Sequence, residues 1–232
     1  MTGEPIEALK ERRWAEVEAI DAALARGEID ESGWHRAMAA LVVPAYLAGE
    51  DPRAQSGYRG DEAAWEHARR PLVAAIDRDG AFLDVGCANG LLMESIVRWA
   101  APHRLEPYGL EIAPELAALA RRRLPQWAAR IFVGNALGWM PPRRFDFVRT
   151  GLDYVPARRR PDLLAHLLEH VVEDDGRLIV GVFKEEPEPL LEREVSSRGR
   201  RIAGRTEAPH PSGHVVYRAF WIDSDARRHE IP

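Results

Sequence analysis

The feature that most constrains this chain is the segment FLDVGCANG at residues 82–90. An apolar run ends at Asp84, Gly86 permits a sharp turn, and a helical pattern begins near Asn89. A strand that turns into a helix in this way brings backbone N–H groups and a helix N-terminus close to a ligand. An ordinary strand-to-helix turn without a ligand is the alternative, so a second signal is needed.

That second signal is Glu111, which ends the next predicted strand 21 positions after Gly90. In doubly wound folds an acid at this place accepts hydrogen bonds from the two hydroxyls of a ribose, so the ligand is predicted to contain a nucleoside. The spacing of Gly86 and Gly90 does not match the G-x-G-x-x-G fingerprint of dinucleotide sites. Asp84 would repel a pyrophosphate, and it suits a ligand that carries positive charge.

Short apolar runs alternate with helical stretches from Gly80 onward, which predicts an α/β fold. The chain ends in two apolar runs separated by only PHPSG, too few residues for a crossover, so this pair is expected to be antiparallel. The prediction is a doubly wound, mostly parallel, seven-stranded sheet with an antiparallel last strand. The expected strands are 81–86, 107–111, 130–135, 145–150, 177–183, 201–208 and 214–223, and the expected helices are 91–99, 114–124, 161–172 and 187–200.

The first 76 residues have a different pattern, with apolar residues at helical spacing over 4–50 and again over 62–76. A loop of small and polar residues, GEDPRAQSGYRGDE at 49–62, lies between them and is called the 49–62 loop. We therefore divide the chain into an N-terminal helical cap or lid, residues 1–76, and a cofactor-binding domain, residues 77–232.

Composition narrows the classes of function. The chain has 232 residues, of which 46% are hydrophobic, enough for one sizeable core. The formal net charge is −5, so the chain has no excess of positive charge of the kind that binds nucleic acids or anionic membranes. The N-terminus lacks the apolar run of a secretory signal, and the single cysteine permits no internal disulfide. We expect a soluble cytoplasmic protein.

DVGCANG resembles motif I of the class I S-adenosylmethionine-dependent methyltransferases, and the resemblance covers about residues 70–223. It implies that Asp84 helps to hold the amino end of the cofactor's methionine and that Glu111 binds the ribose. Asn135 and Ala136 correspond to the position that flanks adenine, where the family more often has Asp. The remaining positions that it assigns to the S-adenosylmethionine site are Gly86, Cys87, Ala88, Gly90, Ile112 and Thr150.

The resemblance implies a methyltransferase, and the expected acceptor is an oxygen or nitrogen of a small molecule, with a natural product as the leading guess. Methyl transfer from a sulfonium is an in-line displacement, in which alignment and exclusion of water are the protein's main tasks. The alternatives are an RNA or protein methyltransferase, a non-catalytic cofactor-binding protein and, from another class, a nicotinamide-dependent oxidoreductase.

Asp153 and Tyr154, in TGLDYVP after the fourth predicted strand, are the candidate catalytic residues. Asp153 would act as a base or orient the acceptor, and Tyr154 would shape the pocket. The alternative is that Asp153 caps a turn and Tyr154 packs. The candidate substrate-binding residues are Gln55, Tyr58 and Trp65. They lie in or beside the 49–62 loop, which would close over the site. The alternative for Tyr58 and Trp65 is structural packing.

Several other features are expected to be structural. His166 and His170 are four residues apart, but HLLEH lacks the glutamate of a catalytic zinc motif, and we expect no metal. The arginine run 121–123 is expected to face water. The side chain of Cys87 is expected to pack rather than react. The N-terminal cap is a further candidate for a homodimer interface.

Overall fold

The computed structural model describes residues 6–185, 190–209 and 216–224. Packing divides the chain into two compact units, Met1–Ala45 and Tyr46–Pro232, and each is described by itself. Among the described residues, no helix combines the length and apolar character needed to cross a membrane.

The first unit is a pair of helices, α1 (Ile6–Ala25) and α2 (Glu31–Leu47), the second of which ends just beyond the unit. Gly27 has a φ of 73°, the left-handed conformation that favours glycine where a helix ends. The Asp30 carboxylate accepts a 2.6 Å hydrogen bond from the Gly33 N–H at the start of α2. The Trp34 indole donates to Asp21 at 2.7 Å and so joins the two helices.

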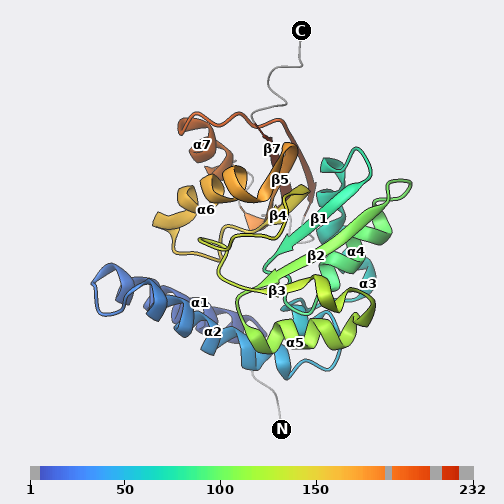
Figure 1. Ribbon diagram of the computed structural model, residues 1–232. Helices are drawn as coiled ribbons and strands as arrows, with labels where there is room; N and C mark the ends of the chain where they lie inside the picture. Colours follow the sequence, from blue (N-terminus) through green and yellow to red (C-terminus); the bar gives the residue numbers. More distant parts are fainter. Residues whose placement is uncertain (1–5, 186–189, 210–215, 225–232) are drawn as a thin grey trace. The chain divides into compact units, whose positions relative to one another are not determined.

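The second unit contains a seven-stranded sheet in the order β3-β2-β1-β4-β5-β7-β6 (Figure 1). The first five strands pair in parallel, and β7 runs antiparallel to both β5 and β6. The predicted doubly wound sheet with its antiparallel strand is therefore confirmed. The strands are β1 (Gly80–Val85), β2 (Leu105–Glu111), β3 (Ile131–Val133), β4 (Phe145–Thr150), β5 (Val172–Glu185), β6 (Gly204–Pro209) and β7 (Val216–Asp223).

Helices cover both faces of the sheet because the strands alternate their apolar side chains between two cores. Leu83 and Val180 point into one core, which includes α6 (Arg160–His166) and α7 (Leu190–Ser197). Phe82 and Ile179 point into the other, with α3 (Glu62–Arg69) and α4 (Leu91–Trp99). A smaller cluster packs α5 (Pro114–Arg123) beside it. Figure 1 shows α6 and α3 on opposite sides of the sheet.

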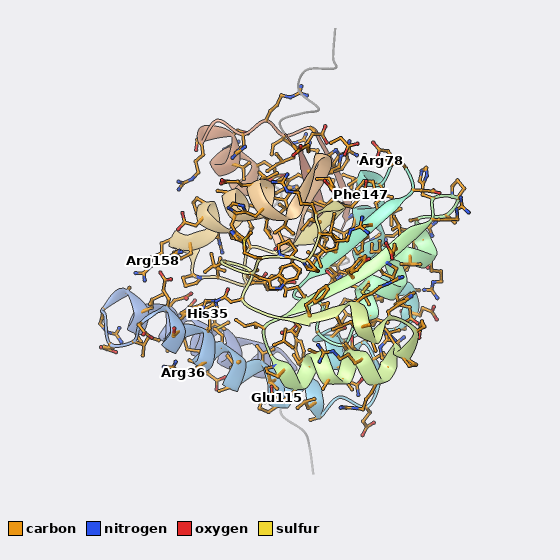
Figure 2. All side chains as sticks on the ribbon, in the orientation of Figure 1. His35, Arg36, Arg78, Glu115, Phe147 and Arg158 are labelled. Atoms are coloured by element: carbon orange, nitrogen blue, oxygen red, sulfur yellow. The ribbon has the colours of Figure 1, made fainter. Side chains whose placement is uncertain are left out.

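The amino edge of the sheet is held by a set of ionic contacts. Arg78 donates to the Asp146 carboxylate at 3.3 Å and to the Asp175 carbonyl at 3.0 Å. Asp146 also accepts a 2.8 Å bond from the Ala81 N–H, which links β4 to β1. Figure 2 shows Arg78 beside Phe147, with its guanidinium carbon 5.1 Å from the ring centre. This edge lies at the opposite end of the strands from the glycine turn.

Two helices differ from the sequence-based prediction. The helix predicted over 62–76 ends at Arg69 and continues as a 3-10 segment, Arg70–Ala75, because Pro71 has no N–H to donate to the preceding turn. The helix predicted over 161–172 is α6 followed by a π-helical turn, Leu167–Val171, and β5 then begins at Val172 rather than at residue 177. The other 3-10 segments are Ala54–Ser56, Pro125–Arg130 and Ala157–Arg159.

Candidate functional site

The glycine turn at the carboxyl end of β1 bends through three residues with positive φ: Gly86 at 72°, Ala88 at 47° and Gly90 at 77°. Glycine is needed at 86 and 90 for a second reason. A Cβ on Gly86 would lie 2.6 Å from the Tyr154 ring, and a Cβ on Gly90 would lie 2.6 Å from Leu124 Cδ1. The left-handed conformation of Ala88 costs a free energy of order 1–2 kcal/mol, because this residue has a Cβ.

Cys87 takes part in this turn only through its backbone. Its N–H donates to the Leu110 carbonyl at 3.1 Å, and its side chain packs with Met93, Ala117 and Ile131. Burial raises the pKa of the thiol well above its ordinary value, which keeps the group neutral. The expectation that the Cys87 side chain packs is confirmed.

Glu111, at the end of β2, connects the turn to the neighbouring strand. One carboxylate oxygen accepts from the Ala88 N–H at 2.8 Å, and the other accepts from the Ala113 N–H at 3.0 Å. Burial raises the pKa of the Glu111 carboxyl, and these backbone hydrogen bonds oppose the rise. Because each carboxylate oxygen has a second lone pair, Glu111 retains acceptor capacity for a ligand.

Asp84, Arg149 and Tyr154 form a connected polar group beside the turn. The buried Arg149 Nη1 donates to Asp84 Oδ1 at 3.2 Å and to the Tyr154 hydroxyl at 2.8 Å. Burial raises the pKa of the Asp84 carboxyl, and the charges of Arg149 and Arg69 oppose that rise. Among the described residues, Asp84 Oδ2 is buried with no hydrogen-bond partner. A buried acceptor of this kind is costly unless a ligand or water satisfies it.

The ends of β2 and β3 leave apolar and polar groups exposed next to each other. Ile112 follows Glu111 and is 42% exposed, as is Val133, whose partner in the sheet is Glu111. Asn135 lies two residues beyond Val133 and is also exposed, with its Oδ1 accepting from the Leu137 N–H at 3.0 Å. Ala136 is half-buried beside it. Exposed Ile and Val next to an amide form a surface that suits a flat heteroaromatic ring.

At the end of β4 the candidate residues lie in three different environments. Thr150 is fully buried, and its hydroxyl donates to the Gly151 carbonyl at 2.9 Å. Asp153 is exposed, and Tyr154 is half-buried against Gly86. The structure thus brings Tyr154 to the turn. The catalytic roles of Asp153 and Tyr154 stay predictions.

The 49–62 loop is fastened to the glycine turn by Asn89, which the sequence did not single out as a site residue. The fully buried Asn89 side chain donates from Nδ2 to the Pro52 carbonyl at 2.7 Å, and its Oδ1 accepts from the Leu91 N–H at 3.1 Å. Within the loop, Gln55 donates to the Gly49 carbonyl at 3.1 Å. The loop therefore lies over the turn, although the substrate-binding role of Gln55 stays a prediction.

Tyr58 and Trp65 surround Arg69, another residue that the sequence gave no reason to select. The Arg69 guanidinium carbon lies 5.2 Å from the Tyr58 ring centre and 5.1 Å from that of Trp65. Burial lowers the pKa of Arg69 to about 10, and the nearby charge of Arg149 adds to the effect. Trp65 is buried, and its indole donates to Ser95 at 3.0 Å. This placement favours the packing alternative for Trp65 over substrate binding.

The arginine run 121–123 was expected to face water, and that expectation is wrong for two of its members. Arg121 donates to the Ile131 carbonyl from both Nε and Nη2. Arg123 donates from Nε to the Asn89 carbonyl at 3.0 Å and also binds Glu94. Arg121 thus binds the backbone of β3, and Arg123 contacts the glycine turn through the backbone carbonyl of Asn89.

No group of three or more His, Cys, Asp or Glu side chains suited to a metal ion occurs among the residues that the structure describes. His166 instead has its Nε2 within hydrogen-bond distance, 3.0 Å, of the Trp139 carbonyl. Its ring centre lies 5.0 Å from that of His170. These two residues do not contribute to the site around the turn.

Comparisons with solved structures identify the fold. The chain is similar to the 1,6-didemethyltoxoflavin-N1-methyltransferase of Burkholderia thailandensis, with a TM-score of 0.62 and 21% sequence identity, over 85% of this chain and 92% of that one. That structure contains 1,6-didemethyltoxoflavin and S-adenosylhomocysteine. No protein-family profile and no curated protein sequence matches the chain.

Two further neighbours agree on the same class of fold. A TehB-like S-adenosylmethionine-dependent methyltransferase of Corynebacterium glutamicum has a TM-score of 0.52 and 19% identity, over 82% of this chain and 98% of that one. The N-methyltransferase NodS of Bradyrhizobium japonicum has a TM-score of 0.51 and 15% identity, over 71% and 96%. The fold of this chain is that of the class I, Rossmann-like, S-adenosylmethionine-dependent methyltransferases.

Proposed function

We propose that this protein is an S-adenosylmethionine-dependent methyltransferase that methylates an oxygen or nitrogen of a small molecule. The observation that carries the proposal is the buried Asp84 oxygen with no hydrogen-bond partner among the described residues, next to the glycine turn and close to Glu111. In a methyltransferase fold, this acceptor suits the ammonium group of the cofactor's methionine.

The surrounding residues fit the other parts of the same cofactor. Glu111 would accept hydrogen bonds from the ribose hydroxyls through its remaining lone pairs, while it continues to hold the turn. Ile112 and Asn135 would face the adenine. The Arg69 guanidinium, which lies near enough to Asp84 to affect its pKa, would face the methionine carboxylate.

The bound cofactor would supply a methyl group on a sulfonium, which a nucleophile displaces in line. This chain's residues would align the partners and exclude water, with Asp153 as the candidate to accept the acceptor's proton or orient it. The 49–62 loop, held on the turn by Asn89, would limit the entry of water.

A small-molecule acceptor is favoured by the neighbour that contains 1,6-didemethyltoxoflavin and by the absence of a basic excess, since the formal net charge is −5. A natural-product acceptor, a homodimer and a cytoplasmic location stay predictions. An RNA or protein acceptor is the alternative.

The test is calorimetry with S-adenosylhomocysteine and, separately, with NAD⁺. We expect S-adenosylhomocysteine to bind and NAD⁺ not to bind. Glu111→Gln should weaken S-adenosylhomocysteine binding at least about tenfold, because a charge-assisted bond to the ribose is lost. Glu106→Gln, at the exposed start of the same strand, is the matched control and should bind normally. Binding of NAD⁺ alone would refute the proposal.

A screen of small-molecule acceptors with methyl-labelled cofactor then identifies the reaction. Transfer of label to a hydroxylated or amine-containing compound supports the proposed acceptor class. Transfer only to RNA or protein would replace it with the alternative.

A further inference from the structure

The Tyr154 ring lies directly on the glycine turn. A Cβ on Gly86 would be 2.6 Å from ring atoms Cε2 and Cζ, and a Cβ on Gly151 would be 3.2 Å from Cζ. The ring therefore occupies a slot between two residues that have no side chain. A side chain on Gly86 would collide with the ring.

Arg149 holds the ring there. Its Nη1 donates to the Tyr154 hydroxyl at 2.8 Å and to Asp84 Oδ1 at 3.2 Å, and its guanidinium carbon lies 5.8 Å from the centre of the Tyr154 ring. Both side chains of the Arg149–Asp84 pair are at most 5% exposed, so water competes little for these contacts. Burial raises the pKa of the Tyr154 phenol, so the hydroxyl accepts from Arg149 as a neutral group.

The same surface is the one that a cofactor would need. If the proposed function holds, the methionine part of the cofactor approaches the backbone of Gly86, because a glycine at such a turn permits close approach of a ligand. Its ammonium group would bind Asp84 Oδ2, next to the oxygen that holds Arg149. A ligand that approached Gly86 from the side of its missing Cβ would meet the Tyr154 ring.

We propose that Arg149 is a positioning residue that holds Tyr154 over Gly86, so that the cofactor and the Tyr154 ring compete for one face of the glycine turn. The cofactor binds only when the ring has moved away. The measured dissociation constant is then the intrinsic one divided by the fraction of molecules with the ring displaced.

The inference is tested by binding of S-adenosylhomocysteine to Tyr154→Phe and Tyr154→Ala. Tyr154→Phe keeps the ring but loses the bond to Arg149, and affinity should rise several-fold. Tyr154→Ala removes the ring, and affinity should rise about tenfold or more, the factor expected when a charge-assisted hydrogen bond no longer stabilises the covered state. Stopped-flow measurements should show the gain mainly as faster association.

The matched controls are Tyr108→Phe and Tyr108→Ala on β2, where the ring packs against Phe132 and Phe145 away from the turn. They lose a tyrosine from the same sheet, and their affinity should equal that of the wild type. Thermal unfolding in the absence of ligand verifies that each variant is folded. A gain in the controls equal to that of the Tyr154 variants would overturn the proposal.

The role of Arg149 is tested by a double-mutant cycle with Arg149→Lys. Lysine keeps the charge, but its side chain is one bond shorter and ends before the position of Nη1, the atom that donates to both Asp84 and Tyr154. The gain from Tyr154→Phe should disappear in that background, because the bond it removes is already lost. A gain that persists unchanged would show that Arg149 does not hold the ring.

The outcomes separate this inference from the proposed function. Weaker or unchanged binding by Tyr154→Ala, with normal binding by the wild type, would refute the competition and leave the methyltransferase proposal intact. Absence of binding by the wild type and by every variant would refute both.

Discussion

The Glu111 carboxylate joins the glycine turn to the end of β2 through the N–H groups of Ala88 and Ala113 while it is nearly removed from water. Burial of an ionised group opposes folding, and hydrogen bonds to it favour folding. The raised pKa of Glu111 indicates that burial has the larger effect. The folded protein therefore binds this proton more tightly than the unfolded chain does.

The Glu111 carboxyl makes the free energy of unfolding depend on pH. An unfolded glutamate titrates near pH 4.3, and folded Glu111 titrates higher, so between the two values the folded state binds more protons. The Glu111 contribution to the free energy of unfolding is fully present below the unfolded pKa and is lost as pH rises through the folded pKa. The slope is at most about 1.4 kcal/mol per pH unit for one proton.

This contribution is measured by denaturant unfolding of the wild type and Glu111→Gln at a series of pH values from about 4 upward. Glu111→Gln replaces the titratable carboxyl by a neutral amide, so the stability of the variant does not depend on this ionisation. The stability of the wild type relative to the variant should therefore fall as pH rises. A difference that is independent of pH would contradict the raised pKa.

Among single residues, the sequence revealed those whose role in the site depends on their near neighbours in the chain. Gly86, Gly90 and Glu111 belong to a strand end or a turn of a few residues, and their spacing is visible in the chain. Arg149 and Asn89 act through partners 65 and 37 residues away, Asp84 and Pro52. Sequence spacing carries no signal for such contacts, since they exist only once the sheet is assembled.

Among the elements, Asn89 is the junction of three segments. Its side chain binds the 49–62 loop and the start of α4, and its carbonyl accepts from Arg123 of α5. All its side-chain polar groups are used and none is exposed. The Asn89 Nδ2 donor therefore makes a side-chain hydrogen bond that links the loop to the glycine turn.

Asn89→Asp removes that donor and keeps the acceptor for the Leu91 N–H. The new carboxylate would face the Pro52 carbonyl, two acceptors in contact, so the loop should be released. Trypsin cleavage after Arg53, followed by mass spectrometry, should be about tenfold faster, as expected for the loss of one buried hydrogen bond. Cofactor should protect the variant less than the wild type.

Ser56→Ala is the matched control, because the Ser56 hydroxyl bonds only to the Arg53 carbonyl within the loop. It should leave cleavage after Arg53 within about twofold of the wild type. Cleavage after Arg177, which is buried within β5, requires the sheet to open, so it reports global unfolding and corrects for it. Equal rates after Arg53 in Asn89→Asp and the wild type would mean that the amide does not hold the loop.

The ends of helices and strands were predicted where a residue type such as glycine determines them. They were missed where packing against distant parts of the chain determines them. Gly86 turns the chain sharply after β1, as predicted. The 3-10 segment after Arg69 and the π-helical turn after His166 were not predicted, because apolar spacing alone does not distinguish these windings from an α-helix. The early start of β5 reflects pairing of Val172 with Phe145, a contact between distant parts of the chain.

For the whole molecule, the parallel and antiparallel directions of the strands followed from the alternation of apolar runs and helices, because parallel strands require crossovers and the short PHPSG link permits none. The acceptor did not follow, since substrate contacts differ among proteins of one fold. Packing divides the chain after Ala45, whereas the sequence-based boundary at residue 76 separates a proposed lid from the cofactor-binding part. That functional boundary stays a prediction.

The second unit contains all the groups proposed to hold the cofactor. A chain of residues 46–232 is therefore expected to fold cooperatively and to bind S-adenosylhomocysteine within about threefold of the full chain's affinity, less than about 0.7 kcal/mol. Circular dichroism during thermal unfolding and calorimetry measure the two properties. If the folded 46–232 fragment fails to bind, residues 1–45 take a direct part in the site. A second fragment, residues 77–232, lacks Arg69 and the 49–62 loop and should bind S-adenosylhomocysteine more weakly.

The ionic contacts at the amino edge of the sheet have a practical consequence. Arg78, Asp146 and the Ala81 N–H join β1 and β4 at one end, and Asp84 and Arg149 join the same two strands at the other. Each of these two strands thus carries structural contacts at its beginning and groups proposed to bind the cofactor at its end. A dye or a tether is therefore best attached beside Arg78, because this region lies at the opposite end of the strands from the candidate site.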